Sequence, residues 1–243
     1  MISKSRWQEA QKGELSFWLW IKKKNEIFPA ESLKRFYECL LLIGDRNKFR
    51  GKLILDVGSG PNGGILNFIE DAVKVAVDPM LKHGLFKIKN DIEGVIGIGE
   101  SLPFPDGKFN MIFAINMLDH VYNPLNVLME FNRVLSKRGL LCLMVNILKS
   151  WEKALNIAVE RPLRRMFRAK NARLYNSLLW YSSQMMKKIK VNIYEDADGH
   201  PFYFTHKQVM DLLGKSGFHI IKLKVTQPEN NYKQDLFALC LKS

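Results

Sequence analysis

The stretch that most constrains this chain is residues 53–64, which read Leu-Ile-Leu-Asp-Val-Gly-Ser-Gly-Pro-Asn-Gly-Gly. A short apolar run that favours a β-strand ends at Asp56 and passes into glycines, and an apolar-periodic segment follows. This pattern predicts a strand, a tight loop and a helix. Glycines let the backbone turn sharply and approach a ligand closely, and the amides of the following helix would point into the same space. The stretch therefore predicts a binding site for a nucleotide cofactor.

Asp56 narrows the choice of cofactor. Gly58, Gly60 and Gly63 also fit the G-x-G-x-x-G spacing of dinucleotide-binding sites. A pyrophosphate at the end of this strand would meet the like charge of Asp56, whereas a ligand with an ammonium and a sulfonium group and no phosphate would be attracted to it. S-adenosylmethionine is such a ligand. The alternative without a cofactor is a glycine-rich turn in which Asp56 only caps a helix.

A second acid follows the next apolar run. Residues 73–77 predict a strand that ends at Asp78, with Pro79 behind it. An acid about 20 residues after the glycine loop, at the end of the neighbouring strand, is placed to accept hydrogen bonds from both hydroxyls of a ribose. The alternative is that Asp78 caps the next helix.

The rest of the chain alternates strands with helices. Apolar runs at residues 94–98, 109–115 and 140–147 predict strands, the second of them buried on both faces, and residues 122–136 predict a helix. Thr205 is expected to cap a helix that ends near Lys215, and strands follow over 218–225 and 234–241. Such alternation implies parallel pairing with right-handed crossovers, which is an α/β fold.

Five motifs now stand in order along residues 50–148, and together they resemble class I S-adenosylmethionine-dependent methyltransferases of the small-molecule type. They are Asp56-Val57-Gly58-Ser59-Gly60, Asp78, Glu100-Ser101-Leu102-Pro103-Phe104, His120-Val121, and Arg133-Val134-Leu135 with Gly139. The resemblance implies a Rossmann-like, doubly wound, seven-stranded and mostly parallel sheet whose last strand is antiparallel. It also implies S-adenosylmethionine as the cofactor, and it says little about the methyl acceptor.

By that resemblance, the glycine loop would surround the methionine part of the cofactor, Asp78 would bind its ribose, and the segment around Glu100 would bind its adenine. Asn116 and Leu118 would line the far wall. The full set expected to bind the cofactor is Asp56, Gly58, Ser59, Gly60, Asp78, Pro79, Met80, Glu100, Ser101, Leu102, Asn116 and Leu118.

Two positions depart from the family pattern. The family commonly has an acid two residues before the glutamate, where it reads the adenine amino group, and here that position is Ile98. Asn62 replaces the usual third glycine. We therefore expect a slightly different loop path and recognition of adenine through backbone groups.

Four segments are expected along the chain. They are an N-terminal helical extension or lid over 1–52, a cofactor-binding core over 53–148, a helical basic cap insertion over 149–200, and a C-terminal helix and strand hairpin over 201–243 that complete the sheet. The first segment predicts helices over 3–25 and 31–45. The aromatic residues of the first helix favour a stripe that faces the core, and the alternatives are a lid over the active site or a helix resting on anionic lipid.

The positive charge is concentrated outside the predicted cofactor-binding core. The chain carries a formal net charge of +13, and residues 1–52 hold 12 basic and six acidic side chains while residues 151–190 hold 10 and two. Both segments could flank a substrate mouth, so an acceptor with an anionic part is expected, and RNA and an anionic membrane surface are alternative partners. The plain alternative is a solvated, basic surface.

Length and cysteine content limit the remaining classes. A chain of 243 residues with 47% hydrophobic side chains can bury the core of one large α/β domain. Its three cysteines lie far apart and match no zinc or disulfide spacing, so we expect buried thiols in a reducing, cytoplasmic compartment and no metal site. No apolar run approaches the length of a membrane span.

Histidines are the candidates for a general base. A hydroxyl acceptor must lose a proton, and His120 follows the fourth strand close to where the methyl group should project. His200 and then His206 are weaker candidates from the loop next to the cap. The sequence thus predicts a methyltransferase acting on a small molecule or glycan, lipid-linked in one version. The alternatives are an RNA methyltransferase and a catalytically silent scaffold with this fold.

Overall fold

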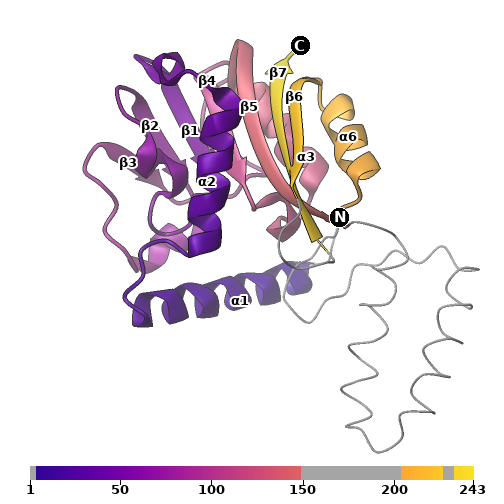
Figure 1. Cartoon of the computed structure of the whole chain (residues 1–243). Helices are drawn as coiled ribbons and strands as arrows, with labels where there is room; N and C mark the ends of the chain where they lie inside the picture. The colour runs from indigo at the N-terminus through magenta and orange to yellow at the C-terminus, as the bar shows by residue number, and fades with distance from the viewer. Residues whose placement is uncertain (1–3, 149–203, 227–232) are drawn as a thin grey trace, which may run out of the picture.

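The apolar runs of the sequence form one seven-stranded sheet in the order β3-β2-β1-β4-β5-β7-β6 (Figure 1). The computed structural model describes residues 4–148, 204–226 and 233–243. The strands are β1 (Leu53–Val57), β2 (Val73–Val77), β3 (Ile92–Val95), β4 (Phe109–Ile115), β5 (Leu135–Leu148), β6 (Phe218–Thr226) and β7 (Lys233–Lys242). Strand β7 is antiparallel to both of its neighbours, whereas β1 to β5 pair in parallel. The predicted fold class is confirmed.

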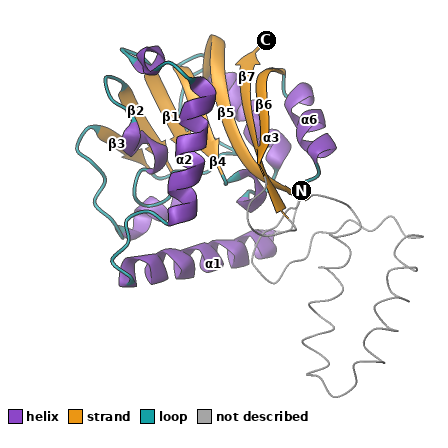
Figure 2. Ribbon diagram, in the orientation of Figure 1, coloured by secondary structure: helices purple, strands orange, loops and turns teal. Residues whose placement is uncertain are grey.

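Helices cover both faces of this sheet, and one helix crosses the end at which the parallel strands finish (Figure 2). Helix α2 (Ala30–Ile43) packs on one face against β5 and β7, while α3 (Pro124–Val134) and α6 (His206–Lys215) pack on the other. Helix α1 (Lys4–Lys23) runs across the edge at which the parallel strands end (Figure 1). Both N-terminal helices agree with the sequence prediction.

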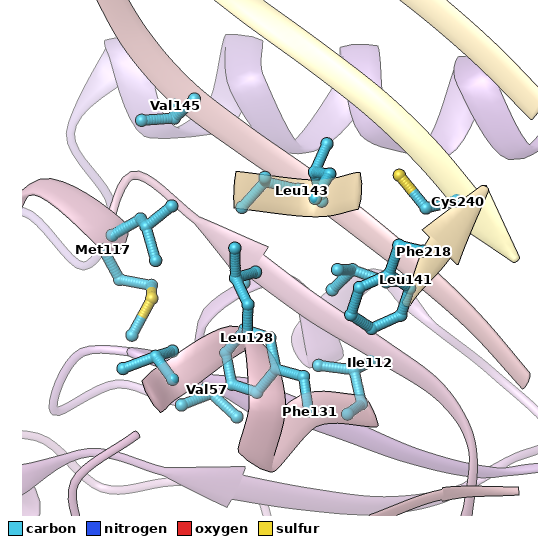
Figure 3. Packing of buried hydrophobic residues seen from close by; sticks show 14 of the residues in the cluster. Val57, Ile112, Met117, Leu128, Phe131, Leu141, Leu143, Val145, Phe218 and Cys240 are labelled. Atoms are coloured by element: carbon cyan, nitrogen blue, oxygen red, sulfur yellow. The ribbon is translucent and has the colours of Figure 1, made fainter. Parts of the chain in front are cut away.

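The core follows from the alternation of side chains along the central strands. Ile112 and Phe113 are neighbours in β4, are both fully buried, and belong to core clusters on opposite faces of the sheet. Figure 3 shows Ile112 packed with Leu128 and Phe131 of α3. Burial on both faces, expected for a central parallel strand, is confirmed for β4.

Helices α3 and α6 each begin directly after a residue whose side chain caps the helix. Asn123 caps α3 and Pro124 occupies its first turn, so this helix begins two residues later than the sequence pattern predicts. Thr205 caps α6 in a capping box with Gln208, and the helix ends at Lys215 as expected.

The helix predicted after β1 is a short 3-10 helix instead, η2 (Gly64–Phe68). Gly63 and Gly64 both have positive φ values, and the Asn67 side chain donates hydrogen bonds back to the carbonyls of Asn62 and Gly64. These local bonds compete with helix propagation, and β2 already begins at Val73. The sequence prediction of a regular helix here was wrong.

Two strand boundaries also differ from the prediction. Strand β3 begins earlier and ends at Val95 because its partner β2 ends at Val77, the residue that Val95 pairs with. Strand β5 starts at Leu135 because the predicted turn over 137–139 lies inside an irregular pairing with β4, where Arg138 has a positive φ. The predicted basic insertion over 149–200, with His200, lies outside the described residues. Within the described residues, no helix is long and apolar enough to cross a membrane.

Candidate active site

A cavity of about 750 Å³ opens where the parallel strands end. Its walls come from the segments that follow β1, β2 and β4, from residues 97–100, and from helices α1 and α2. Cavities of this size hold cofactors and small substrates, and in open α/β sheets such ligands bind at the carboxyl ends of the strands.

Asp56 lies at the end of β1 beside the glycine loop. Its side chain is buried, and its Oδ2 accepts a hydrogen bond from the Ile65 amide at 3.2 Å. Gly64 approaches so closely that a Cβ at this position would lie 2.2 Å from Asp56 Oδ2, and its φ of +53° also favours glycine. Burial raises the pKa of Asp56 well above its usual value. A cationic ligand group beside this carboxylate would favour its charged form.

Asp78 connects the ends of two strands. Its Oδ2 accepts from the Gly60 amide at 2.8 Å and its Oδ1 accepts from the Met80 amide at 2.7 Å. It therefore caps the 3-10 helix η3 (Pro79–His83), which was one of the two roles predicted. Each carboxylate oxygen has a second lone pair, so the same side chain can also accept from ligand hydroxyls. Burial raises the pKa of Asp78 to about 6, against the opposing effect of the two amide hydrogen bonds.

Most of the residues expected to bind the cofactor line this cavity. They are Asp56, Gly58, Ser59, Gly60, Asp78, Pro79, Met80, Glu100 and Asn116. Ile98, where the family has an acid, also lines it. Their individual roles remain predictions.

Three other expected residues lie outside the cavity wall. Leu102 and Leu118 are buried in the core cluster under α3, and Ser101 is exposed. Glu100 lines the cavity, but its Oε1 accepts hydrogen bonds from the amides of Tyr122 and Asn123 and so holds the start of α3. A loop residue next to a binding motif can serve the scaffold instead of the ligand, and sequence spacing does not distinguish the two.

Helix α1 contributes residues that the sequence motifs did not single out. Trp18 packs over the glycine loop, where a Cβ on Gly60 would lie 2.6 Å from its ring, and it meets Phe86 edge-on at 6.0 Å between centroids. Trp7 packs against the core, whereas Trp20 is half exposed. Trp7 and Trp18 both line the cavity, so the preferred prediction of a core-facing aromatic stripe describes only the contact that Trp7 makes with the core.

Asn62 stands where the family pattern has a third glycine, and its side chain makes two hydrogen bonds. Its Nδ2 donates to the Ile27 carbonyl at 2.6 Å, and its Oδ1 accepts from the Gly64 amide at 3.2 Å. A glycine could make neither bond. The asparagine therefore ties the glycine loop to the linker between α1 and α2.

His120 ends the short helix η4 (Leu118–His120) and lines the cavity. Its Nδ1 lies 3.1 Å from Glu14 Oε1 of α1, and its Nε2 lies 3.7 Å from Asp119 Oδ1. His206 is an exposed residue of α6 and does not line the cavity. In the described part of the chain, no group of side chains is arranged to hold a metal ion.

Comparison with known proteins agrees with this geometry. Residues 55–143 match the family model of the methyltransferase domain. The chain contains a class I S-adenosylmethionine-dependent methyltransferase domain. An uncharacterized protein of Methanocaldococcus jannaschii is 31% identical over 113 residues, which are 45% of this chain and 48% of that protein. The chain thus spans about half the length of this curated relative.

Solved structures share the fold of the methyltransferase domain at low sequence identity. The 1,6-didemethyltoxoflavin-N1-methyltransferase of Burkholderia thailandensis, solved with S-adenosylhomocysteine, has a TM-score of 0.59 at 12% identity, covering 100% of this chain and 92% of that one. The [4+2]-cyclase SpnF has a TM-score of 0.57 at 13% identity, covering 85% of this chain and 81% of that one.

The residues of the cavity fit the cofactor of this domain. Asp56 and Asp78 are two buried carboxylates on adjacent strands, and each faces a cavity with room for a ligand. Asp56 would hold a cationic group, and Asp78 has lone pairs left for ribose hydroxyls. The glycine loop itself carries no lysine or arginine that could bind a phosphate, and the described lysine and arginine that line the cavity, Lys34 and Arg35, come from α2.

Proposed function

We propose that this chain transfers a methyl group from S-adenosylmethionine to a small-molecule or glycan acceptor. The observation that carries the proposal is the pair of buried acids, Asp56 and Asp78, at one end of a cavity that continues toward β5 and β7. The continuation, lined by Asn146 and Asp235, leaves room for an acceptor beside the cofactor.

The protein's share of the reaction is alignment and exclusion of water. When bound, the cofactor supplies a methyl group on a positively charged sulfur, and in-line displacement needs the acceptor atom held on its axis. Helix α1 forms a wall over the glycine loop through Trp18, which keeps water from this end of the cavity.

His120 is the proposed base for a hydroxyl acceptor. Its ring faces the cavity, and Glu14 lies close enough to Nδ1 to orient the ring and to stabilise the imidazolium that forms. An amine acceptor with a free lone pair needs no such base, so the effect of replacing His120 distinguishes the two classes.

Two rival functions make different predictions. The basic residues between 151 and 190 favour an RNA methyltransferase, whose binding would weaken steeply with salt. The second rival is a catalytically silent scaffold with this fold, which would fail to bind S-adenosylmethionine; the cyclase among the structural neighbours has the same fold.

The deciding experiment is calorimetric titration of the purified chain with S-adenosylmethionine and S-adenosylhomocysteine. Asp78→Ala should weaken both by roughly 10- to 100-fold, the worth of hydrogen bonds to a charged group. Asp78→Asn, which keeps an acceptor for one backbone amide, guards against misfolding of the loop. Asp211→Ala, on the exposed face of α6, is the control.

No binding by folded wild-type protein would reject the enzyme assignment. Once binding is established, transfer of labelled methyl groups to small-molecule or RNA fractions, with and without His120→Asn, separates the remaining functions. Methylation of RNA alone would replace the proposed acceptor class.

A further inference from the structure

The cavity contains a second polar group of residues away from the glycine loop. Asn116 follows β4, Asn146 lies in β5, Asp235 lies opposite Asn146 in β7, and Arg35 reaches them from α2. All four line the cavity. They come from four elements and lie next to the end that the cofactor would occupy.

These side chains form a chain of hydrogen bonds. Asn146 Nδ2 donates to Asn116 Oδ1 at 2.5 Å, Arg35 Nη2 donates to Asn146 Oδ1 at 3.4 Å, and Arg35 Nε donates to Asp235 Oδ2 at 3.5 Å. The two bonds from Arg35 are at the long limit for such contacts. The guanidinium therefore holds the cluster loosely.

Asp235 has an unused acceptor inside this cluster. The Asp235 side chain is only 9% exposed, and its Oδ1 is buried and accepts no hydrogen bond from the residues that the structure describes. A buried carboxylate oxygen without a donor is costly, and such groups are rare in folded proteins. A ligand N–H or O–H group in the cavity would remove this cost.

A second unused acceptor faces the same cavity from α1. Gln11 Oε1 is also buried without a hydrogen-bond donor among the described residues, and Gln11 lines the cavity one turn before Glu14. Helix α1 and strand β7 thus each present a buried acceptor oxygen for which the described residues supply no donor. A ligand with N–H or O–H groups would supply these donors.

The charge of the cavity wall points the same way. Its described residues include six carboxylates and two basic side chains, Lys34 and Arg35, although the whole chain carries a net charge of +13. Glu14, Glu31 and Asp235 remain after Asp56, Asp78 and Glu100 are assigned to the cofactor end. The Glu31 side chain is 82% exposed and lies 3.9 Å from Arg35, so Glu14 and Asp235 are the two that remain for the acceptor. An anionic group here would meet like charge at close range in a partly dry site.

We propose that Asp235, with Asn146, Asn116 and Gln11, forms the acceptor subsite, and that it takes an uncharged or cationic group bearing N–H or O–H donors, an amine above all. This inference rests on the proposed function and names its substrate class. An anionic part of the acceptor, which the basic segments predict, would have to lie away from this end of the molecule.

The test uses pairs of compounds in which one member carries a cationic aminomethyl group and the other carries an anionic carboxylate at the same position. Tyramine with 4-hydroxyphenylacetate, and histamine with imidazole-4-acetate, are titrated at millimolar concentration into the full chain saturated with S-adenosylhomocysteine. The same pairs are offered as methyl acceptors with labelled S-adenosylmethionine. We expect each amine to bind at least tenfold more tightly than its carboxylate partner.

Asp235→Asn should abolish this preference while leaving the affinity for S-adenosylhomocysteine within about twofold, because the change removes the charge and keeps the shape. Asp211→Asn, the same change on the exposed face of α6, should leave the preference intact. Thermal melting of both variants checks folding, and Gln11→Leu provides a second variant on a different element.

Each other result overturns the inference. Equal or tighter binding of the carboxylates, no binding of either amine by cofactor-saturated protein, or a preference that survives Asp235→Asn would all reject the subsite. These outcomes occur with S-adenosylhomocysteine bound, so they leave the proposed function standing. Failure to bind S-adenosylhomocysteine at all would reject the proposed function itself.

Discussion

Several residues of this site serve the fold and the ligand at the same time. Asp78 caps η3 and fixes the Gly60 amide, yet the same carboxylate faces the cavity. Its burial makes the charged form unfavourable in the free protein. Proteins accept such costs where a ligand later relieves them, and this makes the site sensitive to pH.

Ionisation of Asp78 should raise the affinity for S-adenosylhomocysteine as the pH increases through about 6. The pKa of Asp78 is about 6 in the free protein, and the ligand hydroxyls need the ionised carboxylate as acceptor. One pH unit below that value Asp78 is ionised in only about a tenth of the molecules, so binding should be roughly tenfold weaker than where Asp78 is fully ionised. Calorimetry across this range should also detect proton release on binding. A flat profile for the wild type, or a step near pH 6 that persists in Asp78→Asn, would contradict this role.

Gly60→Ala should damage both stability and binding. Its φ of +67° disfavours alanine, and the new Cβ would lie 2.6 Å from the Trp18 ring. Gly51→Ala is a matched control, since Gly51 has a φ of +68° and open space around it. We expect a loss of about 1 kcal/mol in the free energy of unfolding for the control and about 2 kcal/mol more for Gly60→Ala. Equal losses in denaturant titrations would show that the contact with Trp18 does not matter.

At the scale of elements, helix α1 and residue Arg133 join segments that are far apart in sequence. Arg133 of α3 donates to the carbonyls of Leu102 and Phe104 and pairs with Glu130 through Nε at 2.7 Å. Two of the recognised motifs are therefore one structural unit that fixes the loop before β4. Helix α1 makes the corresponding link on the cavity side, through Trp18 and Glu14.

Trp18→Ala should release S-adenosylhomocysteine faster, by roughly an order of magnitude, because the helix then no longer packs on the glycine loop. Trp20→Ala removes the same side chain from the same helix, but that ring is half exposed, with Lys24 Nζ 3.8 Å from its centroid. Stopped-flow displacement measures both rates. Similar dissociation from the two variants would mean that α1 is not part of the binding site.

At the scale of the whole molecule, the two core clusters on opposite faces of the sheet bury all three thiols. Cys39 of α2, Cys142 of β5 and Cys240 of β7 are free and fully buried. Burial raises the pKa of Cys39 well above the usual range and that of Cys240 to about 12, so neither forms a reactive thiolate in the folded state.

Reaction with a disulfide reagent such as Ellman's reagent should therefore report unfolding. All three thiols should react promptly in denaturant. In the native protein all three should react slowly and at the same rate, because each becomes accessible only when the protein unfolds. Saturation with S-adenosylhomocysteine at about 100 times its Kd should slow native labelling by roughly a further hundredfold, because the ligand binds only the folded state. Prompt reaction of a single thiol in the native protein would reveal local opening of the helix or strand that carries it.

The sequence alone determined the parts of this protein that depend on local pattern. Apolar periodicity placed β2 and β4 to the residue, and the alternation of strands with helices predicted a mostly parallel sheet. The antiparallel last strand was predicted from the resemblance to the methyltransferase family. The glycine loop followed by Asp56 and the later Asp78 predicted the cofactor end, because strand ends of a parallel sheet meet at one edge.

Only the tertiary structure decided which side chains share the cavity. Arg35, Asn146 and Asp235 are separated by up to 200 residues and come together through the pairing of β5 with β7 and the packing of α2 on both. No motif marks them, since each is an ordinary polar residue in its own element. Burial then determined their chemistry. The Asp235 carboxylate would be solvated in an unfolded chain, whereas in the fold its Oδ1 is buried and accepts from no donor among the described residues.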